Sequence, residues 1–410
     1  MPANPESIML PALSLYVHMP WCVRKCPYCD FNSHESTGAL PEKEYVDALL
    51  CDLDGELAAV RDRSLISIFF GGGTPSLFSG AAIERLLDGI RARLPLSADI
   101  EITLEANPGT AEAGRFKAYR AAGVNRLSIG VQSFRDEQLR ALGRIHDAAE
   151  VERAWQMARA AGFDNINLDL MYALPGERDA AGALADLNRA LDFAPEHLSW
   201  YQLTLEPDTA FHRKPPALPD EDVVHAIEER GRRLLAEAGY RRYEVSAYAR
   251  AGRSSRHNLN YWQFGDYLGI GAGAHGKLTA ADGVITRRAK QRNPRSYMKL
   301  AGTLPVMTEE RIASAAQITS EFMMNALRLC EGVPVNLFEE RTGLPLSSIQ
   351  QEIQRARELD LLERDDFVLR PTARGRRYLN DLIAVFAGTP APVIHSAIEV
   401  GDSRHAGHAA

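Results

Sequence analysis

The sequence of 410 residues contains no long apolar run and no excess of basic residues. No stretch approaches the roughly 20 apolar residues that a membrane-spanning helix needs. Residues 1–9 also lack the basic start and apolar core of a signal peptide. The formal net charge of −7 does not suggest a surface for nucleic acid or anionic lipid. These absences predict a soluble, cytoplasmic protein with no transmembrane segment and no nucleic-acid partner.

Cysteine is also scarce, but its distribution is informative. The chain has five cysteines, an odd number with three in one short segment, which argues against a disulfide framework. Those three are Cys22, Cys26 and Cys29, spaced as C-x-x-x-C-x-x-C directly after the apolar run Leu13–Val17. Clustered thiols of this kind indicate a soft-metal or iron–sulfur site.

The number of clustered thiols narrows the kind of site. A structural zinc ion or an ordinary four-iron cluster is held by four protein ligands, whereas three thiolates on such a cluster leave one iron open to another ligand. From the residues alone, a zinc loop and three unrelated thiols stay as alternatives. The other two cysteines, Cys51 and Cys330, lie apart in helix-like sequence and are expected to be small buried apolar residues.

Strand patterns alternate with amphipathic helical patterns up to about residue 206. Six β-then-α units, rich in β-branched and aromatic residues, predict a parallel sheet. Because six units are too few for a closed eight-stranded barrel, the predicted fold is α/β, a partial (β/α)6 barrel. The predicted strands are Leu13–His18, Leu65–Phe70, Asp99–Ala106, Arg126–Gln132, Asn165–Tyr172 and Leu198–Leu205.

The rest of the chain predicts an extension and a second domain. A helix is expected over 220–238 and a strand over 242–249, and later three helices, a hairpin over 361–369 and a last helix indicate a winged-helix-like module. No concentrated basic surface marks that module as DNA-binding. The predicted regions are a flexible N-terminus (1–12), the barrel core (13–206), a barrel extension (207–307), a mainly helical, winged-helix-like domain (308–386) and a disordered tail (387–410).

Polar residues stand where the predicted strands end, which is the face of an α/β barrel that carries its chemistry. After the second strand comes Gly71–Pro75, where successive glycines let a ligand approach the backbone, although such a run alone is most often a turn. The following strands end at or near Glu105, Asn107, Gln132, Asp169, Gln202 and Thr204. Together these positions predict a ligand site.

These features resemble the radical S-adenosylmethionine (SAM) superfamily. The resemblance implies a [4Fe–4S] cluster on Cys22, Cys26 and Cys29, with SAM on the open iron. SAM carries a sulfonium, an amine, a carboxylate and a ribose diol, so its site needs hydrogen-bond acceptors and a cation such as arginine. Similarity to the oxygen-independent coproporphyrinogen III oxidase family implies SAM contacts at Tyr16, Tyr28, Gly72, Gly73, Thr74, Glu105, Gln132, Arg144 and Asp169.

Within that family, the chain from about residue 13 to residue 385 resembles the branch of haem chaperones known as HemW. The matching segments include YVHMPWCVRKCPYCDFN, EANPGT and NLDLMYALPGE. The oxidases have a further cysteine two residues after the third, where this chain has Phe31. The chaperone branch has an H-N-x-x-Y-W motif implicated in haem binding, present here as His257, Asn258, Tyr261 and Trp262.

An imidazole can ligate haem iron, and flat aromatic side chains can cover a porphyrin. From the residue types alone, the alternative is a loop with aromatics in the core and a histidine that is only hydrogen-bonded. The iron-ligating atom therefore stays open. A G-x-G-x-x-G pattern over 271–276 is interpreted as a tight turn, because Asp282 comes too early for the acidic residue of a dinucleotide site.

The resemblance implies a haem chaperone that binds the cluster, SAM and haem and delivers haem to recipient haemoproteins, expected to be respiratory. It also implies an electron donor such as flavodoxin or ferredoxin, a homodimer, and peripheral contact with the membrane during delivery. No catalytic residue is assigned, and SAM cleavage is left open. The alternatives are an oxygen-independent coproporphyrinogen III oxidase of porphyrin biosynthesis and a zinc-dependent structural or regulatory protein.

Overall fold

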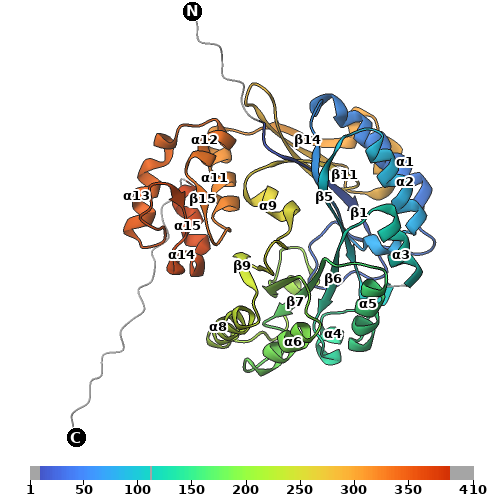
Figure 1. Cartoon of the computed structure of the whole chain (residues 1–410), viewed down its shortest axis with the longest axis horizontal. Helices are drawn as coiled ribbons and strands as arrows, with labels where there is room; N and C mark the ends of the chain where they lie inside the picture. Colours follow the sequence, from blue (N-terminus) through green and yellow to red (C-terminus); the bar gives the residue numbers. More distant parts are fainter. Residues whose placement is uncertain (1–9, 111–112, 388–410) are drawn as a thin grey trace, which may run out of the picture.

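The computed structural model describes residues 10–110 and 113–387 (Figure 1). Of the predicted flexible termini, residues 1–9 and 388–410 lie outside this range. No helix in the described part of the chain is long and apolar enough to cross a membrane.

One large sheet organises the described chain, and its middle is parallel from β11 through β8. In sheet order, the strands are β14 (Met307–Ile312), β13 (Ile285–Lys290), β12 (His275–Thr279), β11 (Asp266–Ile270), β1 (Leu13–Met19), β4 (Leu65–Gly72), β5 (Leu96–Ala106), β6 (Arg126–Gln132), β7 (Ile166–Tyr172), β8 (His197–Gln202), β10 (Ala247–Ala249) and β9 (Arg241–Glu244). The six predicted strands are neighbours in chain order, from β1 to β8. The sheet ends in β14 and β9, so the predicted open α/β barrel is confirmed.

Helices pack on the outer, convex face of the sheet (Figure 1). They are α1 (Glu42–Glu56), α2 (Gly80–Arg91), α3 (Ala113–Ala122), α4 (Asp136–Ala141), α5 (Ala148–Ala160), α6 (Ala181–Asp192) and α8 (Glu221–Glu237). Alternation along β1 explains the two faces: Leu15 and Val17 are buried in the core shared with these helices, while Tyr16 and His18 point to the inner face. The inner face is therefore left to polar and aromatic side chains.

The prediction of a single strand over 242–249 is wrong, because the segment folds back at Val245 and Ser246 into antiparallel β9 and β10. The strands β11 to β14 were not predicted. Shorter elements are β2 (Trp21–Cys22), which pairs with β3 (His34–Glu35), and the helices α7 (Ala210–Arg213) and α10 (Pro294–Leu300). Cys51, expected to be buried, is exposed on α1.

The short helix α9 (Arg256–Trp262) lies on the inner face of the sheet, against β1, β4 and β11. Its first turn is held by the buried carboxylate of Glu101 on β5, which accepts hydrogen bonds from the backbone N–H groups of Arg256 (3.1 Å) and His257 (3.2 Å). Asn260 donates to Ser14 Oγ of β1 at 2.9 Å. The H-N-x-x-Y-W segment is thus a half-buried helix and not a loop.

The C-terminal part is mainly helical, as predicted. It contains α11 (Ala315–Ala326), α12 (Asn336–Thr342), α13 (Gln350–Glu358), α14 (Ala373–Arg377) and α15 (Leu379–Phe386), with β15 (Val333–Pro334) antiparallel to β16 (Val368–Leu369). The predicted hairpin over 361–369 is different in detail: β16 pairs with β15, and Leu362 forms a bridge with Pro371. Leu259 and Trp262 of α9 pack against the core of this part, which ties it to the barrel. The predicted domain boundaries stay predictions.

A buried group of charges joins α1 to β13. Lys290 Nζ lies 2.6 Å from Asp52 Oδ1 and 2.6 Å from Glu56 Oε1, and all three side chains are nearly inaccessible to solvent. Tyr297 donates to Asp52 Oδ2 at 2.7 Å and accepts from the N–H of Gly271 at 3.0 Å. This network holds the turn between β11 and β12 in place.

We expect Lys290→Ala to lower the free energy of unfolding by about 3–5 kcal/mol, because it leaves Asp52 as a buried carboxylate without its cation. The matched control is Arg85→Ala, which breaks an exposed ion pair with Asp47 and should cost about 0–1 kcal/mol. Urea unfolding followed by circular dichroism measures both. Equal effects of the two substitutions would contradict a structural role for the buried group.

Candidate cluster and ligand site

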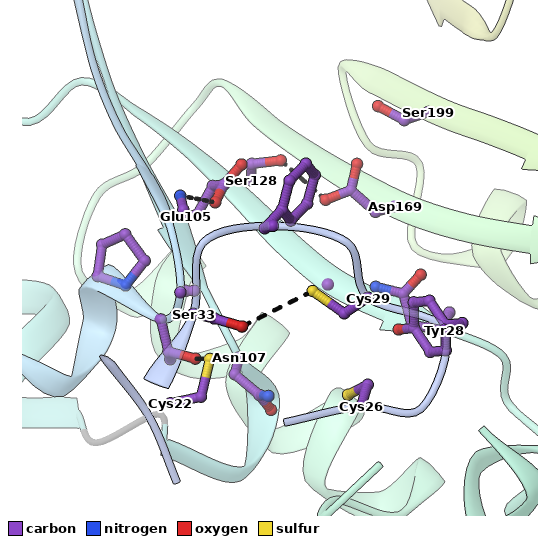
Figure 2. A pocket seen from close by; sticks show the side chains of 18 of the residues that line it. Cys22, Cys26, Tyr28, Cys29, Ser33, Glu105, Asn107, Ser128, Asp169 and Ser199 are labelled. Atoms are coloured by element: carbon purple, nitrogen blue, oxygen red, sulfur yellow. Dashed lines mark hydrogen bonds between the residues drawn. The ribbon is translucent and has the colours of Figure 1, made fainter. Parts of the chain in front are cut away.

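A cavity of about 350 Å³ opens at the carboxyl ends of the parallel strands. Figure 2 shows that the cysteine loop forms one side of it and that Glu105 and Asp169 lie on the opposite side. The predicted site residues that line it are Cys22, Cys26, Tyr28, Cys29, Gly72, Gly73, Thr74, Glu105, Gln132, Arg144, Asp169, Asn258 and Trp262. Strand ends that are far apart in the sequence therefore meet in one cavity.

The three thiols line this cavity, and few polar groups contact them. Cys22 Sγ accepts a hydrogen bond from Thr74 Oγ1 at 3.4 Å, and Arg144 Nη1 lies 3.8 Å from Cys26 Sγ. Burial raises the pKa of Cys22 and of Cys29. Both side chains are thus protonated when free, and they would release protons on binding a metal.

The three thiols can be compared with the ligands that a zinc ion and a four-iron cluster each need. A tetrahedral zinc ion draws its ligands to within about 2.3 Å of one point, whereas a four-iron cluster takes one thiolate at each of several irons. Within the described residues, no three His, Cys, Asp or Glu side chains are grouped as ligands of a single ion. Three thiols line one cavity, which suits a four-iron cluster with one open iron and leaves a tetrahedral zinc ion one protein ligand short.

Two carboxyl groups face the cavity from neighbouring parts of the sheet. Burial, followed by repulsion from Asp169, raises the pKa of Glu105 to about 8. Burial also raises the pKa of Asp169. Hydrogen bonds from Asn167 Nδ2 (2.8 Å) and Ser128 Oγ (3.0 Å) lower it, but the effect of burial is larger. Neither carboxyl forms an ion pair with a described residue. A cationic or hydrogen-bond-donating ligand would therefore stabilise this pair.

Arg144 supplies the cation at the same cavity. Its Nη2 donates to the carbonyl of Gly130 at 2.7 Å, but its buried Nε has no hydrogen-bond partner among the described residues. A buried donor without a partner costs about 1–3 kcal/mol. A carboxylate in the cavity would satisfy it, so the polar groups fit a ligand that carries both an anion and a cation.

The glycine run is explained largely by packing. A Cβ on Gly73 would lie 2.5 Å from the carbonyl oxygen of Trp21, and the N–H of Gly73 donates to the carbonyl of Met19 at 2.7 Å. The N–H of Thr74 likewise donates to Trp21 at 2.7 Å. Since these N–H groups are occupied, a ligand at this run would be bound through carbonyl groups.

Gln132 ends β6 in the left-handed region, with φ 68°, which is uncommon for a residue other than glycine. Its Oε1 accepts a hydrogen bond from Tyr201 of β8 at 3.0 Å, inside the cavity. Such strained positions gather at functional sites. The backbone conformation thus supports the choice of Gln132 as a site residue.

Three predicted site residues do not line this cavity. Tyr16 and Tyr261 line a second one nearby. His257 lines neither: its Nδ1 is hydrogen-bonded to Ser67 Oγ (2.9 Å) and its Nε2 to Tyr261 Oη (3.1 Å), and burial lowers its pKa to about 3. In this conformation His257 has no free nitrogen for a metal.

Comparison with known proteins gives the family. Residues 16–187 match the radical SAM superfamily, and residues 313–378 match the HemN C-terminal domain. The chain is 50% identical over 379 residues to the heme chaperone HemW of Escherichia coli (strain K12), covering 92% of this chain and 99% of that protein. The chain belongs to the HemW family of radical SAM proteins. It is also 48% identical over 381 residues to HemW of Haemophilus influenzae, covering 92% and 98%.

A solved structure agrees with the fold of this HemW-family chain. Coproporphyrinogen III oxidase (HemN) of Escherichia coli, a radical SAM enzyme, matches with a TM-score of 0.78 and 23% identity, covering 92% of this chain and 91% of that one. At this identity, the likeness shows the fold alone.

Several cavity residues were not predicted from the sequence. Ser199 and Tyr201 line the cavity from β8, whereas Gln202 and Thr204, which were expected there, do not. The alternation of side chains along β8 could have predicted these two residues, because residues 199 and 201 lie on the same face of the strand. Two further lining residues come from the β9–β10 hairpin, which was not predicted: Glu244 ends β9, and Ser246 lies in the turn.

We expect Glu105→Gln to become increasingly stabilising as the pH rises. A carboxyl whose pKa rises to about 8 on folding contributes stability at low pH that is lost as the pH approaches that value. The wild type should lose about 2 kcal/mol relative to the variant between about pH 6 and pH 8, at roughly 1.4 kcal/mol per unit. Thermal unfolding across this range tests it, with the exposed Glu237→Gln as the control that should show no such trend.

Proposed function

We propose that this protein is a radical-SAM-type haem chaperone, which binds a [4Fe–4S] cluster, SAM and haem and delivers haem to recipient haemoproteins. The observation that carries the proposal is 50% identity to a heme chaperone over 99% of that protein's length. The cavity supports it, because thiols, acids and an arginine with an unsatisfied donor line one space.

Cys22, Cys26 and Cys29 would hold the cluster, which supplies an electron and an iron with an open position when bound. The protein contributes the shape and the charges around it. Arg144 lines the cavity with a buried Nε that has no partner among the described residues; it would bind the carboxylate of SAM, because the planar guanidinium suits that group. Glu105 and Asp169 would accept hydrogen bonds from the amine and the ribose.

Other residues would shape the site around SAM. Gln132 is held by Tyr201 and presents its amide to the cavity. The N–H groups of Gly73 and Thr74 are bonded to Met19 at the end of β1 and to Trp21 of β2, so the carbonyls of Gly72 and Gly73 would be the backbone groups that bind SAM. Tyr28 covers the cavity wall and packs on Phe211, with ring centroids 6.4 Å apart. Tyr16 lies outside this cavity, and a SAM contact there stays a prediction.

The alternative activity is oxidative decarboxylation of coproporphyrinogen III, the reaction of an oxidase with this fold. At the position of the oxidase's additional cysteine, this chain has Phe31, whose side chain is 60% exposed and lines the cavity. Anaerobic, reconstituted protein supplied with SAM and a reductant should form no protoporphyrinogen IX. Formation of that product would favour the oxidase.

Partners follow from the same proposal. Reduction of the cluster requires an electron donor such as flavodoxin or ferredoxin, and haem delivery requires recipient haemoproteins, which we expect to be respiratory. We also propose a homodimer promoted by cluster or haem, and peripheral approach to the membrane during delivery. Size-exclusion chromatography with and without cluster and haem tests the dimer.

The direct test of the function is haem transfer. Reconstituted protein loaded with one haem is mixed with the apo form of a b-type haem protein, and the acceptor's spectrum is followed after separation of the two proteins. We expect transfer by the wild type, with haem-loaded albumin as the control for passive release. Failure of the wild type to bind haem at all would refute the proposal.

For the cluster, we expect Cys22→Ser, Cys26→Ser and Cys29→Ser each to lose most of the bound iron and sulfide, because each thiolate would hold a different iron. Cys51→Ser is the matched control, since Cys51 is exposed on α1 and lines no part of the cavity. Iron and sulfide analysis after anaerobic reconstitution measures this. A full complement of iron in any of the first three variants would contradict the assignment.

A further inference from the structure

A second cavity, of about 370 Å³, lies beside the first on the inner face of the sheet. Phe31 of the cysteine loop lines both cavities, so the two spaces adjoin at this residue. The volume is within the range of about 300–1,000 Å³ typical of sites for small molecules and cofactors. Since cluster and SAM ligands line the first cavity, the second is the adjoining space available for another flat ligand.

The helix α9 contributes to both cavities through two of its faces. Residues four apart on a helix share a face, so Asn258 and Trp262 reach the first cavity together. His257 and Tyr261 form the adjacent face, and Tyr261 lines the second cavity. The H-N-x-x-Y-W motif thus divides its side chains between the two spaces.

Aromatic side chains make up much of the second cavity. Tyr16, Tyr261 and Tyr267 line it together with Phe31. The rings of Tyr261 and Tyr267 are perpendicular, with centroids 4.5 Å apart. Tyr261 is held from behind by His257, whose Nε2 lies 3.1 Å from the tyrosine oxygen. Rigid, flat, apolar area of this kind suits a porphyrin.

Two histidines line this cavity, and only one of them has a free ring. His18 is hydrogen-bonded through Nδ1 to Tyr16 Oη (3.0 Å) and through Nε2 to the carbonyl of Asn32 (2.8 Å). His275, at the start of β12, is exposed, and its ring has no hydrogen-bond partner within residues 10–110 and 113–387. A neutral imidazole with a free nitrogen is the usual protein ligand of haem iron.

The rim of the second cavity carries one base, Arg292, and one acid, Asp30. The guanidinium of Arg292 is exposed and forms no ion pair with a described residue. A neighbouring cavity shares Tyr267 and His275 with this one. Its arginines form ion pairs within the protein: Arg287 pairs with Glu321, and Arg288 pairs with Glu56. Arg292 is therefore the cation available to a carboxylate of a ligand in this cavity.

We infer that haem binds in the second cavity, with His275 as axial ligand of the iron, Arg292 on a propionate and the ring system against Tyr261. His257 acts as a positioning residue that fixes Tyr261. The inference rests on the proposed function, because it names the place where the chaperone's cargo is bound. The cargo would lie next to the proposed cluster site, with Phe31 lining both spaces.

The test is a haem titration of the full-length, reconstituted protein followed by absorption and electron paramagnetic resonance spectra. For His275→Ala we expect loss of the histidine-ligated spectrum and a fall in affinity of about tenfold or more, equivalent to roughly 1.4 kcal/mol. Added imidazole should restore the ligated spectrum. His225→Ala, an exposed histidine on α8, is the matched control and should behave as the wild type.

His257 is tested separately. His257→Ala should weaken haem binding but keep the histidine-ligated spectrum, and it should add little in a Tyr261→Phe background, because the two residues act through one hydrogen bond. A His257→Ala protein that loses the ligated spectrum while His275→Ala keeps it would overturn the inference. So would a His275→Ala protein with wild-type affinity and spectrum. In both cases the wild type still binds haem, so the proposed function would stand.

Discussion

The parallel pairing of β1 with β4 on one side and β11 on the other determines where the candidate ligands lie. Parallel strands end at one edge of a sheet, so the cysteine loop after β1, the glycine run after β4 and the acids on β5 and β7 open onto the same space. Strand β11 adds the turn that leads to His275. The inner-face residues of β1, Tyr16 and His18, line the second cavity.

Two pairs of buried acids illustrate how the same residue types can serve structure and the proposed binding. Asp52 and Glu56 are matched within the protein by Lys290, which lies 2.6 Å from each. Glu105 and Asp169 form no ion pair in the described chain, and burial raises the pKa of both. Burying acids without a cation is costly unless a ligand supplies the charge or they stay protonated. The unmatched pair supports the proposed binding site.

The helix α9 shows how a motif can be divided by its fold. Glu101 holds its first turn, and Ser67 and Tyr261 occupy both nitrogens of His257. His257, the first residue of the motif, is therefore held by hydrogen bonds within the protein. Asn258, Tyr261 and Trp262 are the motif residues that line the cavities. His275 stands apart in the sequence, but β12 brings it to the same cavity as Tyr261.

The sequence by itself determined the six parallel strands, the open barrel, the cysteine loop and the strand-end residues of the first cavity, because period-two alternation and strand-end residues are local signals. Tyr28, Arg144, Asn258 and Trp262 followed only from the family resemblance. Only the tertiary structure decided which faces α9 presents, why Tyr16 and His257 lie outside the first cavity, and that β9 and β10 fold back to bring Glu244 and Ser246 into it. It also decided the place of His275. These depend on pairings between segments about 250 residues apart, such as Ser14 with Tyr267, and no local pattern encodes such a partner.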